Sequence, residues 1–244
     1  MNRRIALLPA LLAMTVGAQA APRDAKEDLK AAIHKLSQAE NYSWSILSTN
    51  SGDTADKYGF ASGEGRIERG GLAWLRTQES PPVEVVVKGG KTAVRLDDGW
   101  ALEQELTGAG AVRRHPNLAA VRSLKSRPRP AAEANELLKL VKDLSTGVDG
   151  YFTSELTPEG VKELLHKSLR TTGRAAEVSS PTGSLAFWVR DGSLTKYEVR
   201  LRGTVTFSSP RPSTWNADQV VTVSLFEVGT SKIDVPGDVR KMVE

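Results

Sequence analysis

The sequence predicts an α+β fold in which a large antiparallel meander sheet is accompanied by a few helices. Residues 183–207 alternate apolar and polar side chains over a length that requires a long β-hairpin with one buried face. Short turns at 89–90, 97–99 and 191–192 join alternating segments directly, and strands joined in this way are antiparallel. Helical spacing of apolar residues is confined to three segments, which are 25–38, 133–144 and 157–169.

The N-terminus has the features of a secretory signal peptide. Arg3 and Arg4 form a basic start, an apolar stretch follows, and residues 18–20 are a small-residue cleavage site. We therefore expect cleavage after Ala20, a periplasmic or secreted protein, and a single domain over 21–244. The apolar stretch is short for a membrane span, and a retained anchor is the alternative.

Composition limits the classes of partner. The full chain has 33 basic and 29 acidic side chains, so the chain without Arg3 and Arg4 has 31 against 29 and a net charge of +2. A charge this small does not by itself imply a polyanionic partner. The chain has no cysteine, which excludes disulfides, thiol chemistry and lipid attachment at cysteine, and fits a bacterial envelope protein held together by its core.

The expected mature chain opens with a helix and continues as strands. Asp24 and Glu27 form a capping pattern, and the following apolar residues recur at helical spacing, which predicts an amphipathic helix over Ala25–Gln38. Residues 42–46 alternate apolar side chains with serines. Residues 57–68 are extended but interrupted by glycines, as expected where a sheet bends.

Each tight turn predicts the register of its hairpin. The turn at 89–90 needs two residues, because this spacing keeps the apolar side chains of both strands on one face. The turn at 97–99 is interpreted as a three-residue loop. The turn at 191–192 is also interpreted as a three-residue loop, with Gly192 at positive φ, because a loop of two residues would place an apolar ring opposite a lysine. The expected pairs are Val85 with Val94, Leu96 with Trp100, Leu185 with Tyr197, and Phe187 with Thr195.

Residues 107–132 are basic and contain no acid. One interpretation is a solvated segment around a short helix. The alternative is a patch for an anionic membrane surface. Nucleic acid is not expected as a partner, because no aromatic residue is interleaved for base stacking. The basic residues are Arg113, Arg114, Arg122, Lys125, Arg127 and Arg129.

The second half of the chain adds two helices and the closing strands. Residues 133–144 carry leucines and a valine on one side of a helix. Thr157 as N-cap and Pro158 at the first helical position open a helix that runs to Leu169. Further strands are predicted at 149–156, 175–190, 218–228 and 232–235.

Patterns for catalysis and for metal binding are nearly absent. There is no Gly-x-Ser-x-Gly motif, and the three histidines have no serine and acid at a spacing that indicates a triad. Glu163 and His166 have the spacing of one half of a carboxylate-bridged metal site, but such a site needs a second copy and more carboxylates. We therefore expect no enzyme activity, no metal and no cofactor.

Aromatic residues on predicted strands are the candidates for lining a ligand site, and core packing is the alternative for each of them. Trp215 is instead placed in a loop before residue 218. The candidates are Trp44, Trp74, Trp100, Phe187 and Tyr197.

An N-terminal helix, a meander, a helical excursion and closing strands follow one another in 29–44, 83–106, 151–165 and 220–236. This order resembles the LolA-like superfamily of periplasmic lipoprotein carriers and mycobacterial glycolipid-carrying lipoproteins. The resemblance implies a sheet of about eleven strands curved into an incomplete barrel, with helices on the concave side over an apolar cavity. The anchoring cysteine and the arginine-proline stretch of family members are absent, so no functional residue is carried over.

The sequence therefore predicts a secreted or periplasmic binding or carrier protein for a hydrophobic, lipid-like ligand. The apolar stripes of the helices are only about two to three turns long, too short to cover every strand, so apolar surface should remain for a guest. The alternative is an envelope interaction module whose cavity is filled by its own side chains. A hydrolytic enzyme is a third and weaker hypothesis.

Overall fold

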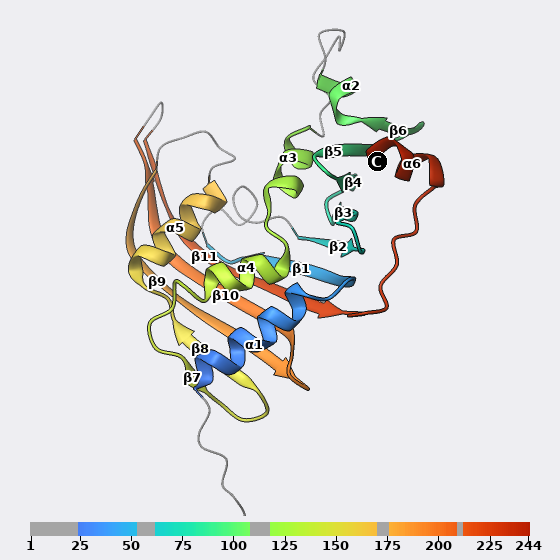
Figure 1. Ribbon diagram of the computed structural model, residues 1–244. Coiled ribbons are helices and arrows are strands. Elements are labelled where there is room, and N and C mark those ends of the chain that lie inside the picture. The colour runs from blue at the N-terminus through green and yellow to red at the C-terminus, as the bar shows by residue number, and fades with distance from the viewer. Residues whose placement is uncertain (1–23, 53–61, 108–117, 170–175, 209–211) are drawn as a thin grey trace, which may run out of the picture.

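Eleven strands form a single antiparallel sheet within the part of the chain that the structure describes (Figure 1). The structure is a computed structural model and describes residues 24–52, 62–107, 118–169, 176–208 and 212–244. The sheet is open, which confirms the predicted antiparallel meander and its incomplete closure. The strands are β1 (Tyr42–Asn50), β2 (Gly63–Ile67), β3 (Ala73–Thr77), β4 (Glu84–Lys88), β5 (Lys91–Leu96), β6 (Gly99–Leu102), β7 (Ser145–Thr146), β8 (Tyr151–Glu155), β9 (Ala176–Arg190), β10 (Ser193–Phe207) and β11 (Ser213–Phe226).

The first and last strands of the chain meet in the middle of the sheet. The strand order is β6-β5-β4-β3-β2-β1-β11-β10-β9-β8-β7, so β1 pairs with β11 and each half of the chain builds one half of the sheet. The expected signal peptide and cleavage site, with Arg113 and Arg114, lie outside the described residues. The helices are α1 (Ala25–Ser37), α2 (Glu103–Thr107), α3 (Leu118–Ser126), α4 (Pro130–Leu137), α5 (Pro158–Leu169) and α6 (Gly237–Val243).

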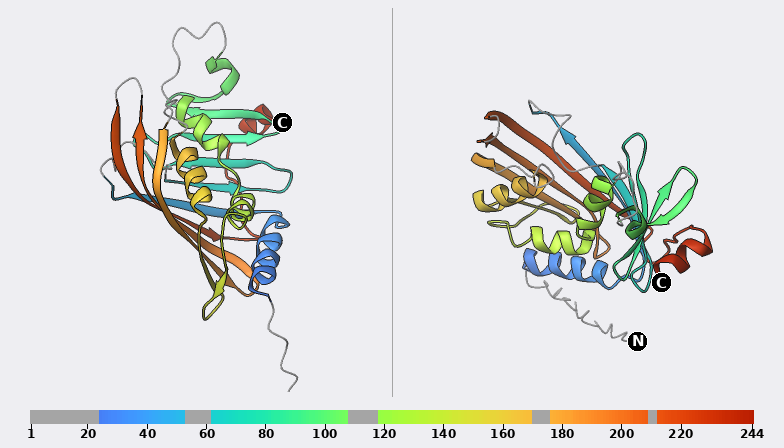
Figure 2. Two further views of the ribbon diagram at one scale, coloured as in Figure 1. Left: turned by 90° about the vertical axis from the view of Figure 1, so that its left-hand side faces the viewer. Right: turned by 90° about the horizontal axis from the view of Figure 1, so that it is seen from above.

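Four helices cover one face of the curved sheet, which is its concave face (Figures 1 and 2). Helix α1 packs against β10 and α4, α5 against β9 and β10, and α3 against β3 and β4. These contacts bury the apolar stripes of the helices against apolar side chains of the strands, which form one continuous main core. The predicted placement of helices on the concave side is confirmed.

Two of the three predicted helices begin where the sequence placed them, and the third does not. The Asp24 carboxylate accepts a hydrogen bond from the Lys26 backbone N–H and caps α1, and the Thr157 hydroxyl accepts one from the Gly160 N–H and caps α5. The helix predicted over 133–144 is α4, which spans Pro130–Leu137. It ends early because the backbone of residues 140–142 pairs instead with residues 155–157 at the end of β8.

The hairpin turn at Asp191-Gly192 contains two residues, so its predicted three-residue loop is wrong. Both residues have positive φ, 52° and 65°, which confirms the left-handed Gly192 and makes a tight turn. A register shift at Thr195 then returns the apolar residues of both strands to the concave face. The bulge removes the conflict that favoured the longer loop. The pairs found are Phe187 with Tyr197 and Leu185 with Val199, in place of the predicted Phe187 with Thr195 and Leu185 with Tyr197.

The two other turns give one confirmed and one corrected register. Val85 pairs with Val94 as predicted. Residues 97–98 also form a two-residue turn, so Trp100 pairs with Arg95 and not with Leu96. Because paired residues share a face, this register moves Trp100 away from the main core to the convex face. There the Arg95 guanidinium lies over its ring, 5.6 Å from the centroid.

A second apolar cluster lies on the convex face, and no sequence pattern predicted it. Residues 227–244 leave β11 and cross this face, where α6 packs against β4 and β5. The predicted strand at 232–235 is irregular in the structure. We call this set of buried residues the outer cluster: Leu72, Val86, Ala93, Ile233, Val239 and Val243.

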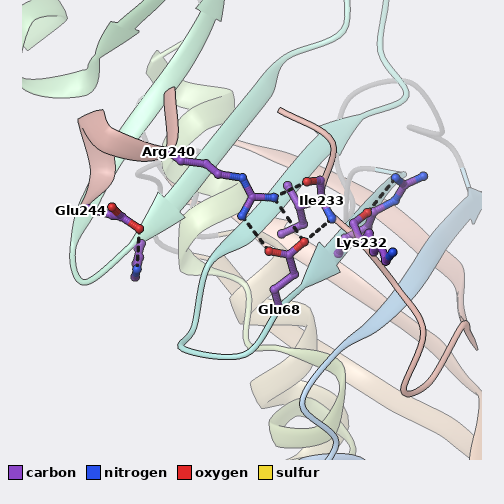
Figure 3. A network of polar contacts seen from close by, with 7 residues as sticks. Glu68, Lys232, Ile233, Arg240 and Glu244 are labelled. Carbon is purple, nitrogen blue, oxygen red and sulfur yellow. Dashed lines mark hydrogen bonds and ion pairs between the residues drawn. The ribbon is translucent and has the colours of Figure 1, made fainter. Parts of the chain in front are cut away.

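A polar network holds the C-terminal segment over the outer cluster (Figure 3). The Glu68 carboxylate accepts hydrogen bonds from the Ile233 backbone N–H at 2.5 Å and from Arg240 at 2.9 and 3.3 Å. Arg240 also donates to the Ile233 carbonyl. At the end of the segment, Lys88 pairs with Glu244 at 3.2 Å. The network thus connects the residue after β2 with α6.

Candidate functional site on the concave face

Three of the five predicted site residues lie together in the main core. Trp44 on β1, Phe187 on β9 and Tyr197 on β10 are buried on the concave face. The rings of Phe187 and Tyr197 are cross-strand neighbours with centroids 6.2 Å apart. The Trp44 ring lies over Gly65 of β2, where a Cβ atom would be only 2.2 Å from its Cζ2 atom. The glycine is therefore what allows a tryptophan to lie flat on this part of the sheet.

The other two predicted site residues, Trp74 and Trp100, lie on the convex face and pack against the outer cluster. The Trp74 indole N–H donates to Glu84 at 2.6 Å, and the Arg66 guanidinium lies 5.4 Å from the centroid of its ring. The sheet therefore separates these two tryptophans from the first three residues. Trp215 lies on β11 and not in a loop, and it is buried in the main core.

A largely covered acid, Glu133, joins the helical cover to the concave face of the sheet, which forms the floor of the site. The Tyr197 hydroxyl donates to the Glu133 carboxylate of α4 at 2.5 Å, and Arg127 donates to the same carboxylate at 3.2 Å. Burial, reinforced by the negative charge of Glu133, raises the pKa of the Tyr197 hydroxyl well above its ordinary value. Tyr197 therefore stays neutral and keeps its donor directed at α4.

Arg129, two residues after Arg127, points to a different neighbourhood. Its guanidinium carbon lies 5.9 Å from the centroid of the Trp44 ring, and its charge interacts with the neighbouring Tyr42. Burial lowers the pKa of Arg129, and Tyr42 partly opposes this effect. Burial also raises the pKa of the Tyr42 hydroxyl, opposed by Arg129 and by the Ala131 backbone N–H. Arg129 thus brings a positive charge to the border of the main core.

The predicted basic patch does not form one exposed surface among its described members. Arg122 is exposed, whereas Lys125 pairs with Glu103 of α2. Arg127 and Arg129 turn inward, as described above. The segment appeared uniformly basic in the sequence because its acidic partners, Glu103 and Glu133, lie just outside it.

Apolar side chains at the α2–α3 end of the main core are only partly covered. They belong to β5, α2 and α3, and they pack against the fully buried residues of the main core while keeping exposed surface. A partly covered apolar border of this kind is where an apolar ligand can gain contacts that the protein itself does not make. The residues are Leu96, Leu106, Ala120 and Leu124.

A polar depression of about 340 Å³ lies at the other edge of the sheet, around β7 and β8. Serine, threonine and charged side chains line it, and Lys142 and Glu155 form an ion pair there at 3.2 Å. The described residues contain no group of three or more side chains placed to hold a metal ion. None of the described helices is long and apolar enough to cross a membrane.

Comparison with known proteins gives matches among solved structures alone. No family model matches the sequence, and no curated protein matches it. The structure is similar to that of the Mycobacterium tuberculosis lipoprotein LppX, with 12% identity and a TM-score of 0.46 over 87% of this chain and 98% of that chain. It is also similar to LprF from Mycobacterium bovis, with 9% identity and a TM-score of 0.45 over 87% and 96% of the two chains.

The first of these is a mycobacterial lipoprotein, a class that the sequence resemblance also named. At this level of identity, neither structure indicates which ligand this chain binds.

Proposed function

We propose that this protein is a binding or carrier protein for a hydrophobic, lipid-like ligand whose apolar part lies between the concave face and its helical cover. The proposal rests on how the concave face and its helical cover are built. One open sheet is apolar on this side, separate helices of 8 to 13 residues cover it, and the cover leaves apolar side chains partly exposed at the α2–α3 end.

The cover is suited to opening because the sheet does not depend on it. The strands are hydrogen-bonded to one another, so a shift of α3 and α4 breaks no pair of the sheet. The hydrogen bond between Tyr197 and Glu133 is a specific polar contact between α4 and the floor. Burying the ligand against apolar side chains supplies about 25 cal/mol for each Å² removed from water, before the costs of ordering.

We further propose that residues 21–244 act as one unit outside the cytoplasm, after removal of the N-terminal segment. The single sheet supports the proposal that these residues act as one unit, because both halves of the chain contribute strands to it and β1 pairs with β11 in its middle. The signal-peptide pattern supports the location outside the cytoplasm and the removal of the N-terminal segment. Contact with an anionic membrane surface stays a prediction, through the exposed Arg122 and through Arg113 and Arg114, which lie outside the described residues.

A second candidate function is supported by one observation. Phe187 and Tyr197 are fully buried by the protein's own side chains, so the floor beneath α4 is already packed. An envelope interaction module with a self-filled interior has this property. The two candidates differ in whether any apolar molecule enters the concave side.

Binding of a fluorescent fatty-acid analogue to delipidated protein distinguishes them. We expect saturable binding, and lipid detectable by native mass spectrometry in protein taken from its host. Trp44→Ala should weaken binding, whereas Trp74→Ala, on the convex face, is the matched control and should not. If delipidated protein binds no apolar probe, the interaction module replaces the carrier.

A further inference from the structure

The guanidinium of Arg129 is a charged group at the border of the site to which the proposed function assigns no role. Arg129 immediately precedes α4, and its side chain is half-buried with the charge over Trp44 and beside Tyr42. Within the described parts of the chain, no carboxylate forms an ion pair with it. Its contacts are therefore an aromatic face and a phenol, neither of which carries a compensating negative charge at neutral pH.

The nearest acid in the sequence is already engaged. Glu133 lies one turn into α4, accepts hydrogen bonds from Arg127 and from Tyr197, and has a side chain that is only 19% exposed. Arg127 and Arg129 thus differ in kind, although only one residue separates them. Arg127 forms an ion pair with Glu133, whereas the charge of Arg129 is left uncompensated.

A charge that is partly removed from water without an acidic partner lowers the stability of the fold. The same charge is useful where a ligand supplies the partner, because a guanidinium binds a carboxylate or a phosphate through two parallel hydrogen bonds. The side chain keeps some exposure, so an incoming anion can reach it. The contact with the Trp44 ring also restrains the guanidinium and lowers the cost of ordering it.

We propose that Arg129 binds the anionic headgroup of an acidic amphiphile whose apolar chain occupies the concave face. This inference rests on the proposed carrier function and specifies its ligand class, which is an alkyl chain ending in a carboxylate or a phosphate. Tyr42, whose ring centroid lies 5.5 Å from that of Trp44, carries a hydroxyl that can donate a further hydrogen bond to the same group.

The test compares ligands that differ only in the headgroup. Delipidated protein is titrated by calorimetry at about pH 8, where a carboxylate is ionised, with oleic acid, its uncharged methyl ester and oleoyl lysophosphatidic acid. The variants are Arg129→Gln, which removes the charge, and Arg129→Lys, which keeps it but cannot bind two oxygens in parallel. Arg122→Gln, an exposed residue of the same segment, is the control.

We expect the wild type to bind an anionic probe roughly 10- to 100-fold more tightly than the ester, the range of a charge-assisted pair. Arg129→Gln should bring this ratio close to one while leaving the affinity for the ester unchanged. Arg129→Lys should keep part of the preference, and Arg122→Gln all of it. The oleate and lysophosphatidate titrations show whether the site favours the carboxylate or the phosphate.

Thermal unfolding without ligand gives an independent readout. Arg129→Gln should not lower the Tm, because it removes an uncompensated charge, whereas Arg127→Gln should lower it, because Glu133 loses its positively charged partner and keeps only Tyr197. Equal affinity of the wild type for acid and ester, or an unchanged preference in Arg129→Gln, overturns the inference and leaves the carrier function standing. Failure to bind any of the three probes overturns both.

Discussion

Replacing Glu68 by glutamine should release part of the C-terminal segment from the convex face. The substitution keeps the shape of the side chain and one acceptor for the Ile233 N–H, but it removes the charge that Arg240 contacts at 2.9 and 3.3 Å. The Glu68 and Arg240 side chains are 21% and 35% exposed, so solvent screens the pair only in part. Hydrogen bonds to charged groups contribute about 1.5–3 kcal/mol each, and after this screening we expect a loss of about 1–2 kcal/mol.

Urea unfolding of Glu68→Gln, Arg240→Gln and the double variant measures this contribution as a coupling free energy, expected to be about 1 kcal/mol. Lys88→Gln is the matched control, because Lys88 ties the same segment to β4 through Glu244 but its pair is 33% and 59% exposed. It should cost less than about 0.5 kcal/mol. A loss in Glu68→Gln no larger than that of the control would show that the network does not hold the segment.

The same network predicts a pH dependence. Burial alone would raise the pKa of Glu68, but the hydrogen bond from Arg240, with the Ile233 N–H and the positive charge, holds it below the usual value of 4.5. A carboxyl with a lowered pKa in the folded state stabilises the fold above about pH 4.5, and this stabilisation is lost as the pH falls through the folded-state pKa. Unfolding free energies measured from pH 6 to pH 3 should fall less steeply in Glu68→Gln than in the wild type. Equal slopes would contradict the prediction.

Three further predictions concern the core, the floor and the N-terminus. Gly65→Ala should cost about 1–3 kcal/mol in urea unfolding, because its Cβ would meet the Trp44 ring at 2.2 Å, and a neutral result would mean that the ring has room to move. The raised pKa of Tyr197 means that the unfolded chain loses this proton first, so stability should fall as the pH rises above about 10.0, and Tyr197→Phe should reduce that fall. Protein expressed with its leader in a bacterial host should start at Ala21 by intact-mass analysis, and a membrane-bound product that retains Met1 would count against processing.

The fold was largely predictable because its strands are amphipathic and its turns are short. The alternation in 183–207 identified the longest hairpin, and the glycine pair at 89–90 set the correct register. Two other predicted registers were wrong because both turns contain two residues. A bulge at Thr195 restores the packing of the concave face after the turn at 191–192, and Trp100 packs on the convex face after the turn at 97–98. A period-two sequence pattern reveals neither the bulge nor a second buried face.

The candidate site was only partly predictable, because strand residues were assigned to one face without knowledge of the second. Trp74 and Trp100 were grouped with Trp44 because each of the three lies on an alternating strand. Part of the convex face is buried as well, because residues 227–244 cover it, and this could not be predicted from the strands alone. That segment is short, and its helix α6 has only 7 residues, which gives little periodic signal. The sequence also did not indicate that the Arg129 side chain turns toward the core, because a segment that is basic and contains no acid is typical of an exposed surface.

The concave face as the binding surface is tested most directly by photo-crosslinking. Delipidated protein is irradiated with a long-chain fatty acid that carries a photoreactive group on its alkyl chain, and the adducts are mapped to single residues by mass spectrometry. We predict adducts on concave-face residues, Trp44 among them, and on side chains of α3, suppressed by excess oleic acid. Adducts that gather instead on the outer cluster or on α6, or none above background, would contradict the account.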